Sequence, residues 1–557
     1  MKYIFLLISL FTFNFLQAQV TGVVKDAAGE PIPGANVFWM NTTNGVTTNE
    51  DGNFSIHKPA RSHMLVVSFI GFENDTIHVD KGNQQLDIVL REGVELSEVN
   101  VVTRKLGTMK LRTSVMNEDM ISSAELTRAA CCNLGESFVT NPSVDVSYSD
   151  AATGAKQIKL LGLSGTYVQM MTENIPNFRG AAAPYGLGYV PGPWMQSIQV
   201  SKGSSSVKNG YESITGQINV EFKKPQLPEA DWVSANLFAS STNRYEANAD
   251  ATVKLSKRWS TSLLAHYENE TKSHDSNDDG FVDIPRVEQY NVWNRWAYMG
   301  DHYVFQAGIK ALHETRNSGQ IAHGNTPSHD LYEIGIKTNR YEAFTKNAYI
   351  FDKEKNTNLA LILQGTLHNQ DANYGRKLYD VDQSNFYASL LFETELSKQH
   401  SLSAGLSFNY DGYDQNYRLT NQAEEGLTKK FVKESVPGAY VQYTFNLNDQ
   451  LMLMGGIRGD YSSEYGFFVT PRAHVKYNPN EYLHFRLSAG KGYRTNHVLA
   501  ENNYLLASSR KMKIASHLDQ EEAWNYGASV STYIPLFGKT LNVNAEYYYT
   551  DFLKQVI

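Results

Sequence analysis

Residues 195–225 read MQSIQVSKGSSSVKNGYESITGQINVEFKKP, and this stretch decides the fold. Apolar and polar residues alternate over residues 197–201 and 217–221, which predicts two β-strands. Glycine tolerates positive φ angles and close approach of another backbone. The segment between and beside the strands holds three such residues: Gly203, Gly210 and Gly216. We therefore expect a small domain with tight turns, packed closely against neighbouring backbone.

The preceding segment, SSAELTRAACCNLGESFVTNPSVDV (122–146), predicts a helix. Ser122 or Ser123 is a suitable N-cap, with Glu125 in the first turn. The apolar residues Leu126, Ala130 and Leu134 recur at i, i+4 and i+8, as expected for one face of a helix. A strand, a glycine turn and a second strand follow in IKLLGLSGTYVQMMTENIPNFRG (158–180).

Residues 1–18 are predicted to be a signal peptide. Lys2 precedes an apolar run over residues 4–15, which is shorter than the roughly 20 residues of a membrane-spanning helix. Because no later apolar run reaches that length, a membrane-embedded chain must cross as a closed barrel. The 33 Tyr and 26 Phe residues fit strands with aromatic rings at a membrane interface.

Residues 19–92 predict a seven-stranded β-sandwich. Short β-branched and aromatic runs alternate there with turn clusters. The text GVVKDAAGEPIPGANV, TTNEDGNFSI and VSFIGFE resembles the carboxypeptidase-regulatory-like domain. The segment contains no metal-binding or nucleophile motif, so we interpret it as an accessory domain and not as an enzyme.

Residues 227–557 predict a transmembrane antiparallel β-barrel. Segments such as LMLMGGIRGDY (451–461) and YLHFRLSAGKGY (482–493) have an alternating pattern of residues, and polar turns separate them. This pattern is typical of membrane strands, and we mark about 14 to 15 of them. The predicted fold class is thus dominated by β-structure: an N-terminal sandwich, an α+β domain over residues 116–226, and a barrel.

The opening stretch resembles the end of the plug domain of TonB-dependent outer-membrane receptors, of the type found in Bacteroidetes. The residues that carry the resemblance are Lys202, Gly203, Gly210, Gly216 and Asn219. Plugged transporters of this kind have 22 strands. We therefore expect that this chain is C-terminally truncated, with a complete barrel of 14 or 16 strands as the alternative.

Residues 93–115 are predicted to be a linker. Within it, Glu98, Val99, Asn100, Val101 and Val102 form an extended run without a neighbouring partner strand. Such a strand invites pairing with another chain. By position and composition it resembles the TonB box, which implies coupling to the TonB-ExbB-ExbD energy complex. An ordinary spacer strand is the alternative.

The segment HDSNDDGFVDIP (274–285) has the spacing of a calcium-binding loop. The candidate ligands fall at loop positions 1, 3, 5, 7 and 9, and they are Asp275, Asn277, Asp279, Phe281 (through its carbonyl) and Asp283. Arg286 stands where such a loop has a bidentate glutamate. A polar extracellular turn without calcium is the alternative, and no cofactor is required for the predicted function.

Soft donors form a second candidate metal site: Cys131, Cys132, Met170 and Met171. Thiolates and thioethers favour Cu(I) and similar ions. The Cα atoms of adjacent residues are about 3.8 Å apart, which is below the usual range for a disulfide. A buried apolar pair, a strained redox-active disulfide and a soft-metal site remain the three interpretations of Cys131 and Cys132.

We interpret the chain as an active importer in the outer membrane, with a periplasmic N-terminal domain and lipid around the barrel. The expected cargo is a scarce nutrient, most simply a metal ion or a metal chelate such as a siderophore, cobalamin or copper. The alternatives are a SusC-like importer of glycans or peptides, and a barrel-anchored binding protein that does not transport. The formal net charge of −8 argues against nucleic acid, and no catalytic motif indicates an enzyme.

Overall fold

The computed structural model describes residues 19–557 apart from a set of gaps. These gaps are residues 27–28, 33, 40–44, 50, 59–62, 70–74, 80–84, 91–107, 112–113, 130–131, 140, 227–231, 322–330, 423–425, 448–449, 481, 516, 537–538 and 557. The chain divides into two compact units, Met1–Arg104 and Lys105–Ile557. Each unit is described separately.

The first unit contains seven strands among its described residues. They are β1 (Gln19–Lys25), β2 (Asn36–Trp39), β3 (Gly45–Thr47), β4 (Asn53–His57), β5 (Met64–Ser68), β6 (Asp75–His78) and β7 (Gln85–Val89). One sheet has the order β4-β1-β7 and the other the order β3-β2-β5-β6. Alternate residues such as Val20, Val24 and Ile56 point into a core around Trp39. The predicted seven-stranded sandwich is confirmed.

The second unit begins with a small mixed α/β domain, which we call the plug. Its strands are β8 (Thr108–Lys110), β9 (Asn117–Ser122), β10 (Val144–Asp150), β11 (Ala155–Leu160), β12 (Leu163–Ser164), β13 (Val168–Thr172), β14 (Ile175–Pro176), β15 (Met195–Lys202) and β16 (Gly216–Phe222). Six of them form a sheet in the order β14-β13-β16-β15-β9-β8. The other three form a sheet in the order β10-β11-β12. The two strands predicted from the opening stretch are β15 and β16, which pair antiparallel.

The helix predicted from residue 122 onward is shorter than expected. Helix α2 spans Ser123–Arg128, and the Ser122 hydroxyl accepts a hydrogen bond from the Glu125 amide, so the predicted cap is confirmed. Leu134 is not on this helix, because Asn133 caps a separate 3₁₀ turn, η1 (Leu134–Phe138). The apolar spacing that predicted one long helix therefore comes from two separate short elements, α2 and η1, which both bury apolar residues.

Five further short 3₁₀ turns connect the plug strands. They are η2 (Gly165–Tyr167), η3 (Gly180–Ala182), η4 (Gly186–Tyr189), η5 (Gly192–Trp194) and η6 (Val207–Asn209). Trp194 and Tyr189 are fully buried and belong to a core that also includes residues of the surrounding strands, such as Trp293. The plug and the strands around it thus share one apolar core.

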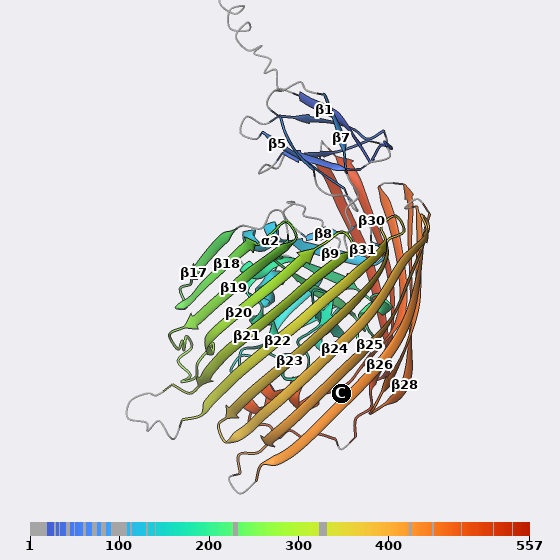
Figure 1. Ribbon diagram of the computed structural model, residues 1–557. Coiled ribbons are helices and arrows are strands. Elements are labelled where there is room, and N and C mark those ends of the chain that lie inside the picture. The colour runs from blue at the N-terminus through green and yellow to red at the C-terminus, as the bar shows by residue number, and fades with distance from the viewer. Residues whose placement is uncertain are drawn as a thin grey trace, which may run out of the picture. The chain divides into compact units, whose positions relative to one another are not determined.

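A single antiparallel sheet of fifteen strands, the wall, curves around the plug as an open sheet (Figure 1). The strands are β17 (Val233–Ala239), β18 (Arg244–Lys254), β19 (Trp259–Glu270), β20 (Arg286–Met299), β21 (Tyr303–Gly319), β22 (Glu333–Asp352), β23 (Thr357–Tyr374), β24 (Lys377–Ser397), β25 (His400–Arg418), β26 (Thr428–Leu447), β27 (Leu451–Ser462), β28 (Gly466–Asn480), β29 (Leu483–Arg494), β30 (Glu521–Leu536) and β31 (Lys539–Lys554). Each strand pairs with the next in sequence. The strand number agrees with the 14 to 15 marked in the sequence.

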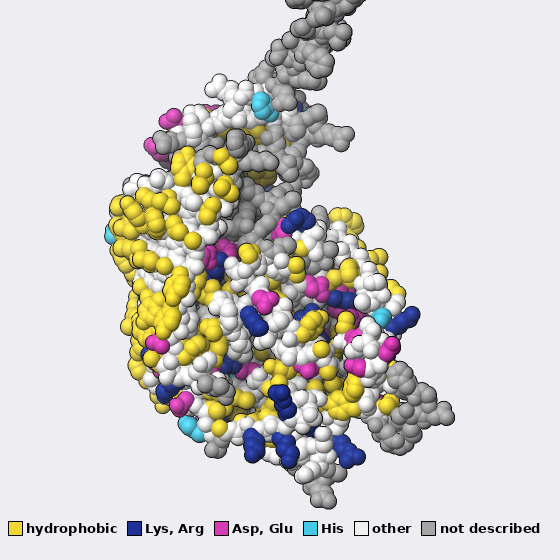
Figure 2. All heavy atoms as spheres, turned by 180° about the vertical axis from the view of Figure 1, so that it is seen from behind, with side chains coloured by type: hydrophobic (Ala, Val, Ile, Leu, Met, Phe, Trp, Pro, Cys, Tyr) yellow, Lys and Arg dark blue, Asp and Glu magenta, His cyan; other side chains and the backbone are white. Residues whose placement is uncertain are grey.

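The wall strands alternate as membrane strands do. In β20, Gln289, Asn291 and Arg295 are buried on the inner side, whereas Val292 and Trp296 are exposed on the outer side. Figure 2 shows hydrophobic side chains gathered in broad areas of the outer surface. A polar inner face and an apolar outer face are the signature of a transmembrane barrel. Of the helices in the described residues, none combines the length and the apolar character needed to cross a membrane.

Candidate functional site

The two ends of the wall differ in their connections. At one end, four connections are long, comprising residues 271–285, 320–332, 419–427 and 495–520. At the other end, all seven connections contain two to four residues. Outer-membrane barrels have short periplasmic turns and longer extracellular loops. The end with the long connections is therefore the extracellular end.

The longest connection, residues 495–520, folds back over the plug. It contains α3 (Val498–Glu501) and η8 (Asn503–Ala507). The Asn503 side-chain oxygen accepts hydrogen bonds from Tyr185 of the plug (3.2 Å) and Tyr374 of the wall (3.0 Å). Lys377 donates to three backbone carbonyls of this connection, at 2.5 to 3.1 Å. The connection is thus fixed to both the plug and the wall.

A cavity of about 160 Å³ lies beneath this connection, bounded by the plug, the wall and the connection itself. This space holds on the order of ten water molecules. Its charged or titratable lining residues are Lys156, Arg179, Glu212, Asp411, Glu434, Arg494, His497 and Glu501. Its aromatic lining residues are Phe178, Tyr211 and Tyr504. The cavity therefore combines four carboxylates, three cations and aromatic rings, at the extracellular side of the plug.

The plug presents Arg179 to the cavity from a strained turn. Phe178 has a φ of +55°, and Gly180 has a φ of +58°. A side chain in this left-handed region costs energy, and such residues cluster at functional sites. A Cβ atom on Gly180 would lie 2.4 Å from the Tyr413 hydroxyl, so the turn approaches the wall as closely as glycine permits.

Arg179 is shared by two carboxylates. Its Nη2 lies 2.5 Å from Glu212 Oε2, and its Nη1 lies 3.5 Å from Asp411 Oδ2. Burial raises the pKa of Glu212, and the guanidinium of Arg179 opposes this effect. Glu434, from the neighbouring strand β26, completes the group of residues that we call the cavity cluster: Arg179, Glu212, Asp411 and Glu434.

Other residues of the cavity are held by the loop that covers it. Arg494 pairs with Glu501 and with Glu521, whose Oε2 is 2.5 Å away. The ring of His497 packs against that of Tyr413, with centroids 4.3 Å apart and an interplanar angle of 35°. Burial lowers the pKa of His497, so its imidazole is neutral at pH 7. A neutral imidazole offers a lone pair to a ligand.

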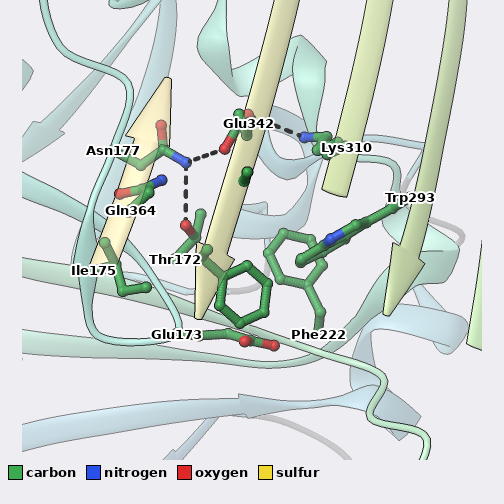
Figure 3. A pocket seen from close by; sticks show the side chains of 11 residues that line it. Thr172, Glu173, Ile175, Asn177, Phe222, Trp293, Lys310, Glu342 and Gln364 are labelled. Atoms are coloured by element: carbon green, nitrogen blue, oxygen red, sulfur yellow. Dashed lines mark hydrogen bonds and ion pairs between the residues drawn. The ribbon is translucent and has the colours of Figure 1, made fainter. Parts of the chain in front are cut away.

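A small pocket beside the cavity shows how the plug turn is fastened to the wall (Figure 3). The Asn177 amide donates to Thr172 Oγ1 (3.1 Å) and to Glu342 Oε2 (2.9 Å). Lys310 faces Glu342 at 3.7 Å. The pocket of about 20 Å³ has room for a single water molecule. Asn177 also lines the large cavity, so the pocket supports the cavity floor.

The residues of the predicted plug motif lie in the turns of the plug and at its contacts with the wall. Lys202 is buried and pairs with Asp119 (2.9 Å) and with Glu546 of the wall (2.8 Å). Lys110 also pairs with Glu546, at 2.5 Å. We call Lys110, Asp119, Lys202 and Glu546 the anchor cluster. Glu546 lies midway along β31 (Lys539–Lys554).

The structure explains why the motif contains three glycines and Asn219. Gly203, Gly210 and Gly216 have φ angles of +77°, +105° and +155°. A Cβ atom on Gly216 would lie 2.3 Å from the Ser201 carbonyl oxygen, so only glycine fits. Asn219 accepts a hydrogen bond from the Asn174 amide (2.7 Å), which fixes the turn before Asn177.

Two arginines of the wall bind plug carbonyls. Arg472 donates to the carbonyl oxygens of Ser205, Ser206, Tyr211 and Ser213, at 3.1 to 3.3 Å. Arg486 donates to the carbonyl of Leu111 at 3.1 Å, close to the start of the plug. Because the guanidinium presents five donors, one side chain satisfies several buried carbonyls.

The candidate calcium loop lies at the extracellular end, between β19 and β20. Asp275 accepts hydrogen bonds from the amides of Asp279 (3.1 Å) and Gly280 (2.9 Å). Asp283 accepts one from the Ser276 amide (2.7 Å), and Asn277 donates to Asp279 (3.0 Å). Phe281 is exposed. The predicted residues therefore share one loop, and calcium binding stays a prediction.

The candidate soft-metal residues lie in different places. Cys131 is outside the described residues, whereas Cys132 is buried and its thiol hydrogen-bonds to Glu246 of β18. Burial raises the pKa of this thiol. Met171 is fully buried, and Met170 lines the large cavity. Across the described residues, no three His, Cys, Asp or Glu side chains gather as a metal-binding group.

The predicted TonB box, Glu98 to Val102, lies outside the described residues. The cavity cluster was missed in the sequence. Arg179 and Glu212 lie in plug turns without a motif, and Asp411 and Glu434 lie on separate wall strands. Because side chains alternate between the two faces of a wall strand, the sequence could have marked Asp411 and Glu434 as facing the lumen. It could not have marked them as neighbours of Arg179.

A plug packed against the inner face of a curved strand wall, with a cavity at its extracellular side, is the arrangement of a gated outer-membrane receptor. The chain belongs to the TonB-dependent receptor family. Residues 199–555 match the TonB dependent receptor-like β-barrel, residues 110–217 match the TonB-dependent receptor plug domain, and residues 20–102 match the CarboxypepD_reg-like domain. The family consists of outer-membrane receptors and transporters, not enzymes.

Curated relatives match parts of the chain. TonB-dependent receptor SusC of Bacteroides thetaiotaomicron is 28% identical over 245 residues, which cover 41% of this chain and 24% of SusC. TonB-dependent receptor P39 of Formosa agariphila is 39% identical over 100 residues, which cover 17% of this chain and 10% of P39. The matched parts thus span a quarter or less of these relatives.

Solved structures share the fold. The alcaligin outer-membrane receptor FauA of Bordetella pertussis has a TM-score of 0.62 and 14% identity, covering 83% of this chain and 77% of FauA. The copper transporter OprC has a TM-score of 0.62 and 12% identity, covering 80% of this chain and 73% of OprC. At these identities the likeness shows the fold alone.

Proposed function

We propose that the chain imports a metal ion or a metal chelate across the outer membrane, driven by the TonB-ExbB-ExbD complex. Membership of the receptor family supports import. The observation that carries the proposal is the cavity at the extracellular side of the plug, which a folded connection covers. A ligand bound there rests on the plug, the part that must move to open the barrel.

The chemistry of the cavity supports the choice of cargo. Carboxylates and a neutral imidazole are ligands for borderline and hard metal ions. Since no three such side chains gather as a metal-binding group among the described residues, the cavity suits a metal chelate better than a bare ion. Solved structures with the same fold include the siderophore receptor PirA of Acinetobacter baumannii and the copper transporter OprC. PirA is named for a siderophore and OprC for copper, which agrees with the proposal.

The second candidate is import of a glycan or peptide, which the sequence similarity to SusC favours. The rings of Phe178, Tyr211 and Tyr504 in the cavity suit a sugar or peptide surface. A metal importer and a glycan importer differ in the nutrient whose limitation slows the growth of a strain that lacks the gene. Limitation of copper, iron or cobalamin in turn therefore separates the two candidates.

The coupling step is tested by altering the predicted TonB box, Glu98–Val102. Proline cannot donate to a β-ladder, so replacing Val99 and Val101 with proline prevents strand addition. We expect this double variant to abolish metal accumulation in whole cells, measured by mass spectrometry. The control, Val99→Thr with Val101→Thr, keeps both amide donors and accumulates metal normally. Unchanged accumulation in the proline variant would contradict coupled import and leave an anchored binding protein.

A further inference from the structure

One carboxylate of the cavity is buried without a cation. Glu434 is 3% exposed and lines the cavity. Among the described residues, its hydrogen-bond donors are two hydroxyls, Ser462 Oγ at 2.5 Å and Thr495 Oγ1 at 3.3 Å. The charged groups that act most strongly on it are Asp411 and Glu212, which are both acidic.

Of the three cations that line the cavity, the two arginines already face carboxylates. Arg179 is shared by two carboxylates of the cavity cluster. Arg494 is likewise shared by Glu501 and Glu521. Lys156 lies over the ring of Tyr148 at 5.2 Å, and the acidic groups that act most strongly on it are Glu136 and Glu268. Among the described residues, no lysine or arginine of the lining forms an ion pair with Glu434.

A second, independent group points to the same kind of ligand. Gln169 is 4% exposed and lines the cavity. Its amide nitrogen donates to the Asn209 carbonyl at 2.6 Å, whereas its carbonyl oxygen Oε1 has no hydrogen-bond partner. A buried acceptor without a donor is costly. Nε of Arg179 also lacks a partner, but its guanidinium is already matched by two carboxylates.

Burying an ionised carboxylate without a partner is unfavourable, so a proton or a bound cation must neutralise it. We propose that the cavity selects a ligand with a net positive charge, and that Glu434 is the residue that faces this charge. The ligand is either a cationic metal complex or an organic ammonium compound, with donors for Gln169. This inference rests on the proposed function, because it names the charge class of the imported ligand.

The test is titration calorimetry of the purified full chain in detergent with three probes. Hexaamminecobalt(III) is an inert cationic metal complex, spermidine is a metal-free cation of equal charge, and tris(oxalato)ferrate(III) is an anionic metal complex. We expect a cationic probe to bind and the anionic one not to bind. Glu434→Gln keeps the two hydroxyl contacts and removes the charge, and it should weaken cation binding about tenfold or more.

The matched control is Glu395→Gln on β24, which removes one carboxylate near the end with the short turns and leaves cation binding unchanged. Binding of both cations supports the charge alone as the determinant, and binding of the cobalt complex only supports a metal complex. Equal cation affinity in native and Glu434→Gln chains, or tighter binding of the anion, overturns the proposal.

Two further readouts keep the result clear. In the native chain, at least one cationic probe must bind more tightly than the anionic complex at equal ionic strength, so the proposal remains testable even if Glu434→Gln does not fold. Equal binding of the anionic complex overturns it. Binding by the purified chain does not need the coupling strand. Normal binding with failed cellular import therefore contradicts the import proposal and leaves the charge class standing.

Discussion

Two of the charged clusters that join the plug to the wall differ in their balance of positive and negative charge. In the anchor cluster, Lys110 and Lys202 meet Glu546 and Asp119, so two cations face two carboxylates. In the cavity cluster, one arginine pairs with two of the three carboxylates, Glu212 and Asp411, and not with Glu434. The anchor cluster is complete without a ligand, whereas the cavity cluster lacks positive charge. Charge balance thus distinguishes a contact that holds the plug from one that recognises cargo.

The largest effect is expected from breaking the anchor cluster. Glu546→Ala leaves Lys110 and Lys202, whose side chains are 6% and 4% exposed, with one carboxylate between them. Removing one partner of a buried ion pair costs about 3–5 kcal/mol. The free energy of plug docking should fall by this order, and trypsin should cleave the plug faster in isolated membranes. An unchanged cleavage rate would show that the ion pairs do not hold the plug.

An intermediate effect is expected from Arg179→Met. The variant keeps the apolar stem and leaves Glu212 and Asp411 without their shared cation, at a cost of about 1–3 kcal/mol. The pKa of Glu212, which burial already raises, should rise further once the opposing guanidinium is gone. Plug cleavage should therefore be faster than in the native chain but slower than in Glu546→Ala. The reverse order would make the cavity cluster the principal anchor.

The smallest effect on stability is expected from Glu434→Gln. The amide keeps the size and the hydrogen bonds of the carboxylate and removes a buried charge that no cation faces, so plug cleavage should not accelerate. The same substitution at the anchor, Glu546→Gln, is the matched comparison and should accelerate it. If both glutamine variants change the cleavage rate equally, the difference in charge balance between the two clusters does not affect the stability of plug docking.

The elements with local signals were predictable from sequence, and the site was not. The alternation of polar and apolar residues predicted the wall strands, because each strand has a polar inner face and an apolar outer face. The glycines of residues 195–225 marked tight turns because their φ angles are positive. The helix from residue 122 was predicted too long, since spacing alone does not show that Asn133 starts a new turn.

The cavity cluster depends on contacts between residues that are far apart in sequence. Arg179 and Asp411 are separated by more than 200 positions. Only the threading of the plug through the wall brings them together, and no local pattern encodes that. Cys132 is a similar case, because its neighbour Glu246 belongs to the second wall strand.

Strand β8 has a mechanical consequence. It lies at the edge of the plug sheet and pairs with β9 through three residues, from Thr108↔Ile121 to Lys110↔Asp119. A pull on the chain ahead of Thr108 opens this hairpin from its free end, so the pairs are loaded one after another and not all at once. Peeling therefore needs little force until it reaches Lys110, where the ion pair with Glu546 acts as a stop that sets the threshold for moving the plug.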